Sequence, residues 1–268
     1  MKKKKTILGL AVIILIIGIT IIYITTQNYE TIETSSTNLS NKKIGWGIKR
    51  NDNHEQPDLG SQNKKVLEEN NGIAMGNSEK KYIYLTFDEG YEAGYTKQIL
   101  ETLKENNVTA TFFITAHYLN TQPELVKQMI DEGHIVGNHT VNHKSMPDLD
   151  SEKIESEIMD LHKAVYSKFG YEMKYIRPPM GEFSERTLTI SNNLGYKTVM
   201  WSFAYKDWEE DNQMTHEDAK KKIIDNVHNG EIMLLHGNSK TNTEILGDII
   251  KEIKNMGYEF KSLDEFEN

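Results

Sequence analysis

The chain has 268 residues, of which 37% are hydrophobic and 26% are charged, a composition typical of a globular protein and not of a disordered one. It contains no cysteine, which excludes disulfides, thiolate nucleophiles and sulfur-ligated zinc, so any metal must be bound by His, Asp or Glu. The formal net charge of −9 argues against nucleic acid as a partner, because a phosphate backbone repels an acidic surface.

The amino terminus has the features of a membrane-targeting segment. Four lysines at positions 2–5 precede an uncharged stretch, residues 6–25, that is dominated by Ile, Leu and Val. A helix of that length spans about 30 Å, the thickness of a bilayer core, and the lysines predict a cytoplasmic amino terminus. We therefore expect residues 1–27 to anchor an extracytoplasmic protein. A cleaved signal sequence is the alternative, but no small-residue cleavage site follows the apolar run.

The residues that follow the anchor resemble a spacer. Residues 28–43 are rich in Thr, Ser and Asn, which is typical of a solvated stalk. A short GWGIKR segment and a polar stretch then lead to residue 80 with little periodicity, so we expect irregular structure at the domain edge. The predicted organisation is an anchor (1–27), a stalk with an irregular extension (28–80) and a catalytic domain (81–268).

From residue 81 onward, apolar runs of strand length alternate with stretches of helical period. The expected helices include one opened by Pro123, one over residues 151–169 that ends at Gly170, and one begun at Thr215. The expected strands cover residues 82–87, 108–115, 134–138, 173–176, 196–204, 231–235 and 258–263. Such alternation predicts a parallel sheet covered by helices, either doubly wound or closed. Because about 180 residues is short for an eightfold barrel, we favour an α/β fold: a distorted (β/α) barrel of about seven parallel strands with outer helices.

Ionisable and aromatic residues follow five of these strands at their carboxyl ends, where ligands bind in parallel α/β folds. Each has an ordinary explanation when taken alone, such as a strand-ending turn, a structural histidine or a proline-fixed bend. Their coincidence at one edge of the predicted sheet indicates a single active site. The residues are Asp88, Glu89, His139, His143, Arg177, Asp207, Trp208 and His236.

The same residues lie in sequence motifs of a known family. TFDEG (86–90), HTVNH (139–143), RPPMG (177–181), Asp207-Trp208 and the Leu-x-His ending at His236 resemble the five ordered motifs of polysaccharide deacetylases with a NodB-type domain. GWGIKR, EGHIVGNHT and the closing YEFKSLDEF are similar to the branch of delta-lactam-biosynthetic de-N-acetylases. The resemblance covers residues 44–268.

This resemblance implies a hydrolytic mechanism based on one acid and one base. Asp88 is the implied general base, and His236 is the implied acid that protonates the departing amine. Arg177 is expected to hold the Asp88 carboxylate, and Asp207 to orient the His236 ring.

The resemblance also implies a divalent metal bound by His139 and His143, with zinc as the expected ion because neutral imidazoles suit it. The third ligand of the family is an Asp, where this chain has Glu89 and the delta-lactam branch resembles an Asn. Glutamate retains a carboxylate but adds a methylene group. We expect Glu89 to ligate the metal directly or through a water, and the identity of the metal stays open.

The implied substrate is the N-acetylmuramic acid of peptidoglycan glycan strands without its stem peptide, bound by a monomeric protein at the cell or forespore membrane. The freed amine and the neighbouring lactyl carboxyl would then close to muramic delta-lactam in spore cortex. The implied substrate-binding residues are Tyr91, Pro178, Trp208 and Leu234. One alternative is a general peptidoglycan or chitooligosaccharide deacetylase without lactam formation. Another is a carbohydrate-binding protein whose metal site Glu89 has impaired.

Overall fold

The computed structural model describes residues 39–268. The predicted membrane anchor, and the first part of the predicted stalk, lie outside the described residues. Within residues 39–268, every helix is too short or too polar to cross a bilayer.

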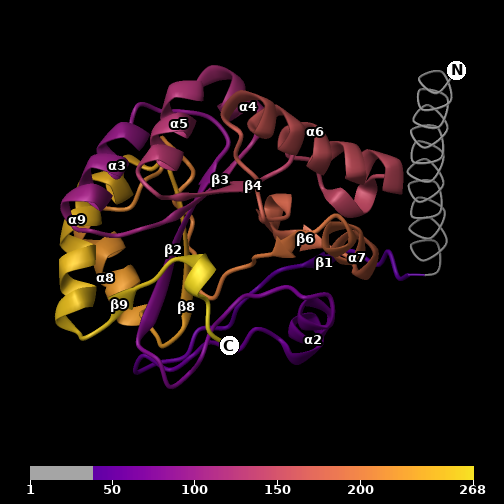
Figure 1. Cartoon of the computed structure of the whole chain (residues 1–268). Helices are drawn as coiled ribbons and strands as arrows, with labels where there is room; N and C mark the ends of the chain where they lie inside the picture. Colours follow the sequence, from indigo (N-terminus) through magenta and orange to yellow (C-terminus); the bar gives the residue numbers. More distant parts are fainter. Residues whose placement is uncertain (1–38) are drawn as a thin grey trace, which may run out of the picture. The chain divides into compact units, whose positions relative to one another are not determined.

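A sheet of seven parallel strands forms the centre of the fold (Figure 1). Its order is β7-β5-β4-β3-β2-β8, and β9 pairs with the start of β2. The long central strand β2 pairs with β3 on one side and with β8 on the other. The strands are β2 (Tyr82–Glu89), β3 (Thr111–Ile114), β4 (Ile135–Asn138), β5 (Tyr175–Ile176), β7 (Lys197–Thr198), β8 (Glu231–His236) and β9 (Glu259–Phe260).

The two edges of this sheet approach one another beyond β7. The strand predicted over residues 196–204 forms regular pairs only at Lys197–Thr198, after which the Met200 amide donates to the carbonyl of Ile73. Phe203 then makes a parallel bridge with Met233 of β8, and the Leu234 amide donates to the Phe203 carbonyl at 2.9 Å. The predicted fold class, a distorted (β/α) barrel of about seven parallel strands with outer helices, is confirmed.

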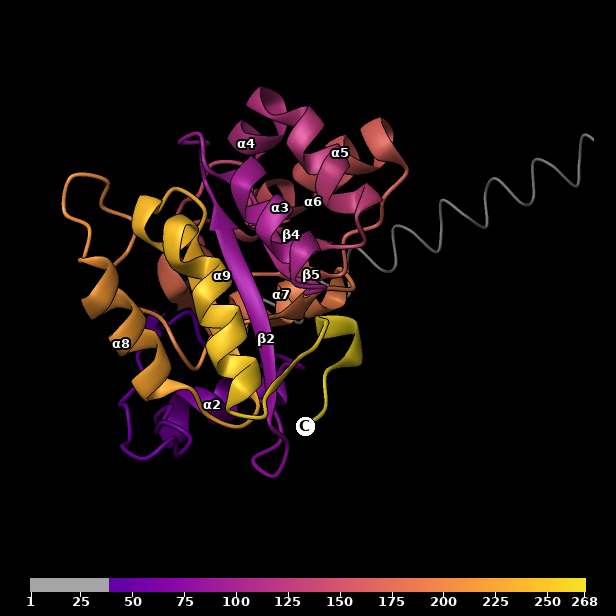
Figure 2. The ribbon, with the colours of Figure 1, turned by 90° about the vertical axis from the view of Figure 1, so that its left-hand side faces the viewer.

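The helices cover the outside of the sheet, and Figure 2 shows α3 and α9 side by side against β2. The predicted bounds of α6 are confirmed, because the Asp150 side chain caps its amino terminus and Gly170 ends it at φ 66°. α9 begins at Lys240, because the side chain of Ser239 accepts from the Asn242 amide and caps the helix amino terminus. The helices after β2 are α3 (Thr96–Glu105), α4 (Ala116–Thr121), α5 (Pro123–Asp131), α6 (Ser151–Phe169), α7 (Glu185–Asn193), α8 (His216–Asn226) and α9 (Lys240–Asn255).

The segment before β2 packs with the domain, because the compact unit begins at Asn41. Its helix α2 (Ser61–Glu69) was not predicted, since Leu67 is its one buried residue and gives no periodic pattern. β1 (Ile44–Gly45) pairs antiparallel with β6 (Glu182–Phe183). The next residue, Trp46, donates its backbone amide to the Gly181 carbonyl at 2.8 Å and its indole N–H to the Trp201 carbonyl at 2.8 Å.

The pairing of β3 with β4 gives a first prediction. Gly137 lies opposite Phe113, and a Cβ atom at Gly137 would lie 2.5 Å from the Phe113 ring. We expect Gly137→Ala to lower the free energy of unfolding by about 1–3 kcal/mol in urea denaturation, as overpacking of a core does. Gly45→Ala is the control, because a Cβ there meets nothing within 4 Å. Equal losses in the two variants would contradict the prediction.

Candidate active site

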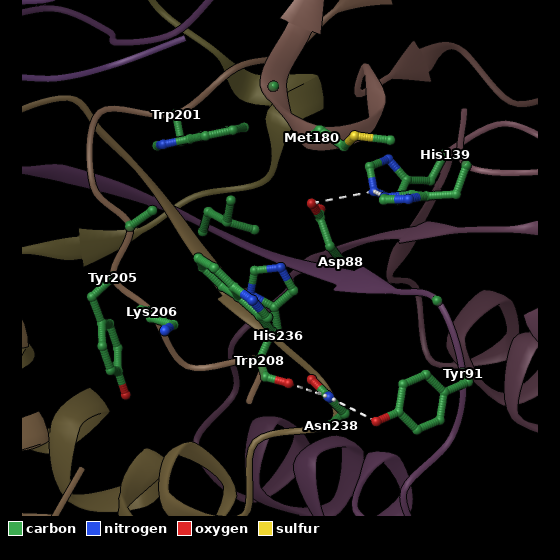
Figure 3. Close-up of a pocket in the computed structure, with 15 residues that line it drawn as sticks. Asp88, Tyr91, His139, Met180, Trp201, Tyr205, Lys206, Trp208, His236 and Asn238 are labelled. Atoms are coloured by element: carbon green, nitrogen blue, oxygen red, sulfur yellow. Dashed lines mark hydrogen bonds and ion pairs between the residues drawn. The ribbon is translucent and has the colours of Figure 1, made fainter. Parts of the chain in front are cut away.

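The carboxyl ends of the strands open into one cavity of about 720 Å³ (Figure 3). Asp88 and His236 are paired residues in the register of β2 and β8, so both side chains project to the same side of the sheet. The cavity is lined by Asp88, Gly90, Tyr91, His139, His143, Met180, Gly181, Trp201, Ala204, Tyr205, Lys206, Trp208, Leu234, His236 and Asn238. Seven of the predicted site residues are therefore brought together here.

Asp88 is buried and held by one arginine. Its Oδ1 accepts from Arg177 Nη1 at 2.8 Å, and its Oδ2 lies 3.5 Å from His139 Nε2. Burial raises the pKa of Asp88, but the positive charge of Arg177 and the nearby histidines outweigh it, so the pKa lies below its usual value. The carboxylate is ionised at neutral pH and can accept a proton from water.

Arg177 itself is fully buried, and its donors are occupied. Besides Asp88, Nη1 donates to Thr86 Oγ1 at 2.9 Å, and Nε donates to the Val199 carbonyl at 3.1 Å. The guanidinium also lies 4.3 Å from the centre of the Phe113 ring. These contacts fix the position of the charge that keeps Asp88 ionised.

His139 and His143 lie in the loop after β4, where His143 has a positive φ of 52°. The His139 Nδ1 donates to the Arg177 carbonyl at 2.8 Å, because a carbonyl can only accept; its Nε2 therefore carries a lone pair. The two Nε2 atoms lie 3.1 Å apart. Burial lowers the pKa of His139 to about 4 and also lowers that of His143, so both rings are neutral at pH 7.

His236, at the end of β8, is held by Asp207. Its Nδ1 donates to Asp207 Oδ1 at 2.7 Å, while Oδ2 accepts from the His236 amide and from Asn242 Nδ2. Burial lowers the pKa of His236, but the Asp207 carboxylate raises it more, and the pKa lies above its usual value. The remaining nitrogen, Nε2, can donate a proton to a bound substrate. The ring of Trp208 lies 5.3 Å from that of His236.

Glu89 does not take the predicted place beside the histidines. Successive side chains of a strand point to opposite faces, so Asp88 faces the cavity while Glu89 is 1% exposed beneath α3. Its Oε1 accepts from Thr96 Oγ1 at 3.4 Å, and its Oε2 has no partner. Burial raises the pKa of Glu89 well above its usual value, which favours its neutral form. The prediction that Glu89 is a metal ligand is wrong for this structure.

The remaining donors fit a divalent cation in part. Within residues 39–268, there is no group of three His, Cys, Asp or Glu side chains arranged to hold a metal. The pair of neutral imidazoles with Nε2 atoms 3.1 Å apart nevertheless offers two nitrogen ligands, and the Asp88 carboxylate lies beside them. His139 also donates its other ring nitrogen to a carbonyl, as metal-binding histidines do.

The predicted substrate-binding residues divide into two groups. Tyr91, Trp208 and Leu234 line the cavity, whereas Pro178 is buried and does not, so its prediction is wrong. Met180 lies there instead, with φ 58° and 59% of its side chain exposed.

Sequence reasoning also missed several lining residues, although one of them ends the recognised RPPMG motif and three directly precede the Asp207-Trp208 pair. These are Gly181, Trp201, Ala204, Tyr205, Lys206 and Asn238.

An ionised carboxylate and an imidazole of raised pKa in one cavity define the acid–base site of a hydrolase. Residues 75–199 match the family model described as polysaccharide deacetylase. The chain belongs to the polysaccharide deacetylases, carbohydrate esterase family 4, which confirms the resemblance found in its motifs.

Two relatives and one solved structure illustrate this similarity. The chain is 44% identical over 226 residues to the peptidoglycan-N-acetylmuramic acid deacetylase PdaA of Bacillus subtilis, covering 84% of this chain and 86% of PdaA. It is 35% identical over 193 residues to a peptidoglycan-N-acetylglucosamine deacetylase of Bacillus cereus, covering 70% of this chain and 89% of the relative. The structure of Bacillus subtilis PdaA superposes with a TM-score of 0.83 at 43% identity, covering 85% and 98% of the two chains.

The Asp207 contact predicts how activity depends on pH. Asp207→Asn removes the charge that raises the pKa of His236, and the predicted role of His236 as the acid requires its protonated form. We expect kcat/KM to fall about 10²–10³-fold and its alkaline limb to move to lower pH, measured by acetate release across the neutral range. Asp225→Asn, on the exposed side of α8, should leave the profile unchanged. An alkaline limb that does not move in Asp207→Asn would contradict this role.

The position of Glu89 gives a separate prediction. Because this side chain is buried outside the cavity, Glu89→Gln should release acetate within about twofold of the original rate. A metal ligand would behave differently, since loss of an ordering contact around a metal costs about 10–100-fold. Asp88→Asn is the comparison, which should be nearly inactive. Similar losses of activity in the two variants would contradict the prediction and would indicate that Glu89 takes part in the reaction.

Proposed function

We propose that this protein hydrolyses the N-acetyl group of peptidoglycan N-acetylmuramic acid residues that lack a stem peptide. The observation that carries the proposal is the register pairing of Asp88 with His236, which sets an arginine-held base and a carboxylate-held acid in one cavity. The muramic substrate is supported by the similarity to PdaA over most of both chains.

In the proposed reaction, Asp88 takes a proton from the attacking water, and His236 gives a proton to the nitrogen that leaves as the amine. Arg177 keeps Asp88 ionised, while Asp207 keeps His236 protonated and fixes its ring. The backbone N–H of Tyr91 is the proposed donor to the developing oxyanion. Trp208 and Leu234 form apolar walls that exclude water from the acetyl group.

His139 and His143 would hold a divalent metal, which we propose to be zinc. When bound, such an ion lowers the pKa of water and polarises a carbonyl oxygen. The neutral state of both imidazoles supports this part of the proposal, because only an unprotonated nitrogen can ligate a metal.

The product chemistry suggests a biological setting. Removal of the acetyl group frees an amine beside the lactyl carboxyl of the same sugar, and such neighbouring groups react readily to form a lactam. We propose that the product becomes muramic delta-lactam in spore cortex. The lysine-flanked apolar segment at the amino terminus supports the further proposal that the protein acts outside the cytoplasm while held at the membrane.

Acetate release from peptide-free peptidoglycan glycan tests the proposal. The protein should release acetate, a chelator should stop the reaction, and added zinc should restore it; Asp88→Asn should lower the rate by about 10²–10⁴-fold. Mass spectrometry of the digested glycan should then find muramic lactam in the presence of a spore-cortex extract.

Other outcomes would identify the alternatives. Acetate release from chitooligosaccharides without release from muramic glycan would refute the substrate and favour a general deacetylase. No release from any glycan by the unmodified protein would refute the enzymatic function and favour a carbohydrate-binding role.

A further inference from the structure

One wall of the cavity is a short loop between the barrel closure and α8. Ala204, Tyr205, Lys206 and Trp208 all line the cavity, and the last three are labelled in Figure 3. Asp207 lies between Lys206 and Trp208 in the chain and accepts from His236 Nδ1 at 2.7 Å. Among the lining residues of the described part of the chain, Lys206 is the one that carries a lysine or arginine charge. The proposed reaction makes no use of this charge.

The ammonium group of Lys206 is held only loosely. Its Nζ lies 2.7 Å from Glu209 Oε1 in the same loop, and the two side chains are 55% and 40% exposed. Exposed ion pairs of this kind contribute little free energy, because water and salt screen them. Another anion at the cavity mouth can therefore replace or join Glu209 at little cost.

We infer that Lys206 binds the lactyl carboxylate of the muramic acid substrate and selects for it, an inference that rests on the proposed function. The acetamide and the lactyl ether sit on neighbouring carbons of the sugar ring. The acetamide nitrogen must lie near His236 to receive its proton, so the lactyl group lies close to the same wall. Lys206 directly precedes Asp207, whose carboxylate holds His236 at 2.7 Å.

The accessibility of the basic side chains supports this assignment. Arg177 cannot reach a bound carboxylate, because it is fully buried and already donates to Asp88, Thr86 and a backbone carbonyl. Lys206 lines the cavity and has 55% of its side chain exposed, so its positive charge is open to a carboxylate of the substrate.

The same charge distinguishes substrates. N-acetylglucosamine has a hydroxyl in place of the lactyl ether, and muramic acid that retains its stem peptide has a neutral amide in place of the carboxylate. Neither gains from the ammonium group of Lys206. A site with this lysine therefore favours glycan from which the peptide has been removed.

A purely structural role for Lys206 makes a different prediction. If the lysine only steadied its loop through Glu209, loss of either partner would disturb the loop in the same way and would affect every substrate. If Lys206 binds the substrate, Glu209→Gln should leave the lysine free and should not weaken binding. The two substitutions thus separate recognition from support.

The test compares four variants on three substrates by steady-state acetate release. The variants are Lys206→Met, Lys206→Arg, Glu209→Gln and the control Lys221→Met, which removes an exposed lysine paired with Asp225 on α8. The substrates are peptide-free glycan, the same glycan with its lactyl carboxyl converted to a methylamide, and chitopentaose.

We expect Lys206→Met to raise KM for peptide-free glycan by about threefold to fivefold with little change in kcat, as loss of one partly exposed charge contact does. The methylamide glycan and chitopentaose should be unaffected, Lys206→Arg should stay within about twofold of the original KM, and neither Glu209→Gln nor Lys221→Met should raise it.

Three results would overturn the inference while leaving the proposed function intact: equal effects of Lys206→Met on all substrates, the same effects from Glu209→Gln, or no preference of the unmodified protein for the free carboxylate. Hydrolysis of chitopentaose without hydrolysis of either muramic glycan would refute the proposed function, and the role of Lys206 with it.

Discussion

The buried ion pair between Arg177 and Asp88 is the interaction on which the site depends. A fully buried guanidinium is costly unless its donors are occupied, and here they reach Asp88 and Thr86 on β2 and the carbonyl of Val199 beyond β7. The pair therefore ties the central strand to the closing segment of the barrel while it sets the charge of the base. Stability and chemistry are coupled in this one contact, because a change in either partner leaves the other charge buried and alone.

Asp88 and His236 are each held by a partner of opposite charge, a cation for Asp88 and a carboxylate for His236. The Arg177 cation favours the ionised carboxylate of Asp88, and the Asp207 carboxylate favours the protonated imidazole of His236, although burial alone favours the neutral form of both. Asp88 and His236 stand on adjacent strands in register, so the backbone hydrogen bonds of β2 and β8 fix their separation. In the proposed reaction, the proton donor and the proton acceptor are therefore in place before a substrate binds.

Sequence patterns predicted the parts of this protein that rest on local or periodic signals. The bounds of α6 followed from Asp150 and Gly170, and the convergence of Asp88, His139 and His236 followed from strand ends in a parallel fold. The predicted first strand ended at residue 87, which left Asp88 and Glu89 in a turn of undefined orientation. β2 instead continues to Glu89, so strand alternation turns Glu89 away from the cavity, to a place where Gly237 leaves room for its carboxylate.

Sequence patterns also missed features that depend on contacts between residues far apart in the chain. The helix α2 depends on one buried leucine, and the pairs made by residues 196–204 depend on partners far along the chain. Lys206 has no motif of its own, and its position in the cavity becomes visible only when the loop is seen beside β8.

The contacts of Trp46 make the segment before β2 part of the support of the cavity wall. Its amide and indole N–H bind the carbonyls of Gly181 and Trp201, both of which line the cavity. A shortened chain that started at β2 would keep Asp88, His139, His143 and His236. It would lose Trp46, and with it the hydrogen bonds to the carbonyls of Gly181 and Trp201 in the cavity wall. The predicted catalytic domain, residues 81–268, is therefore shorter than the unit that supports the cavity wall, and homologous domains can be exchanged cleanly only upstream of this tryptophan.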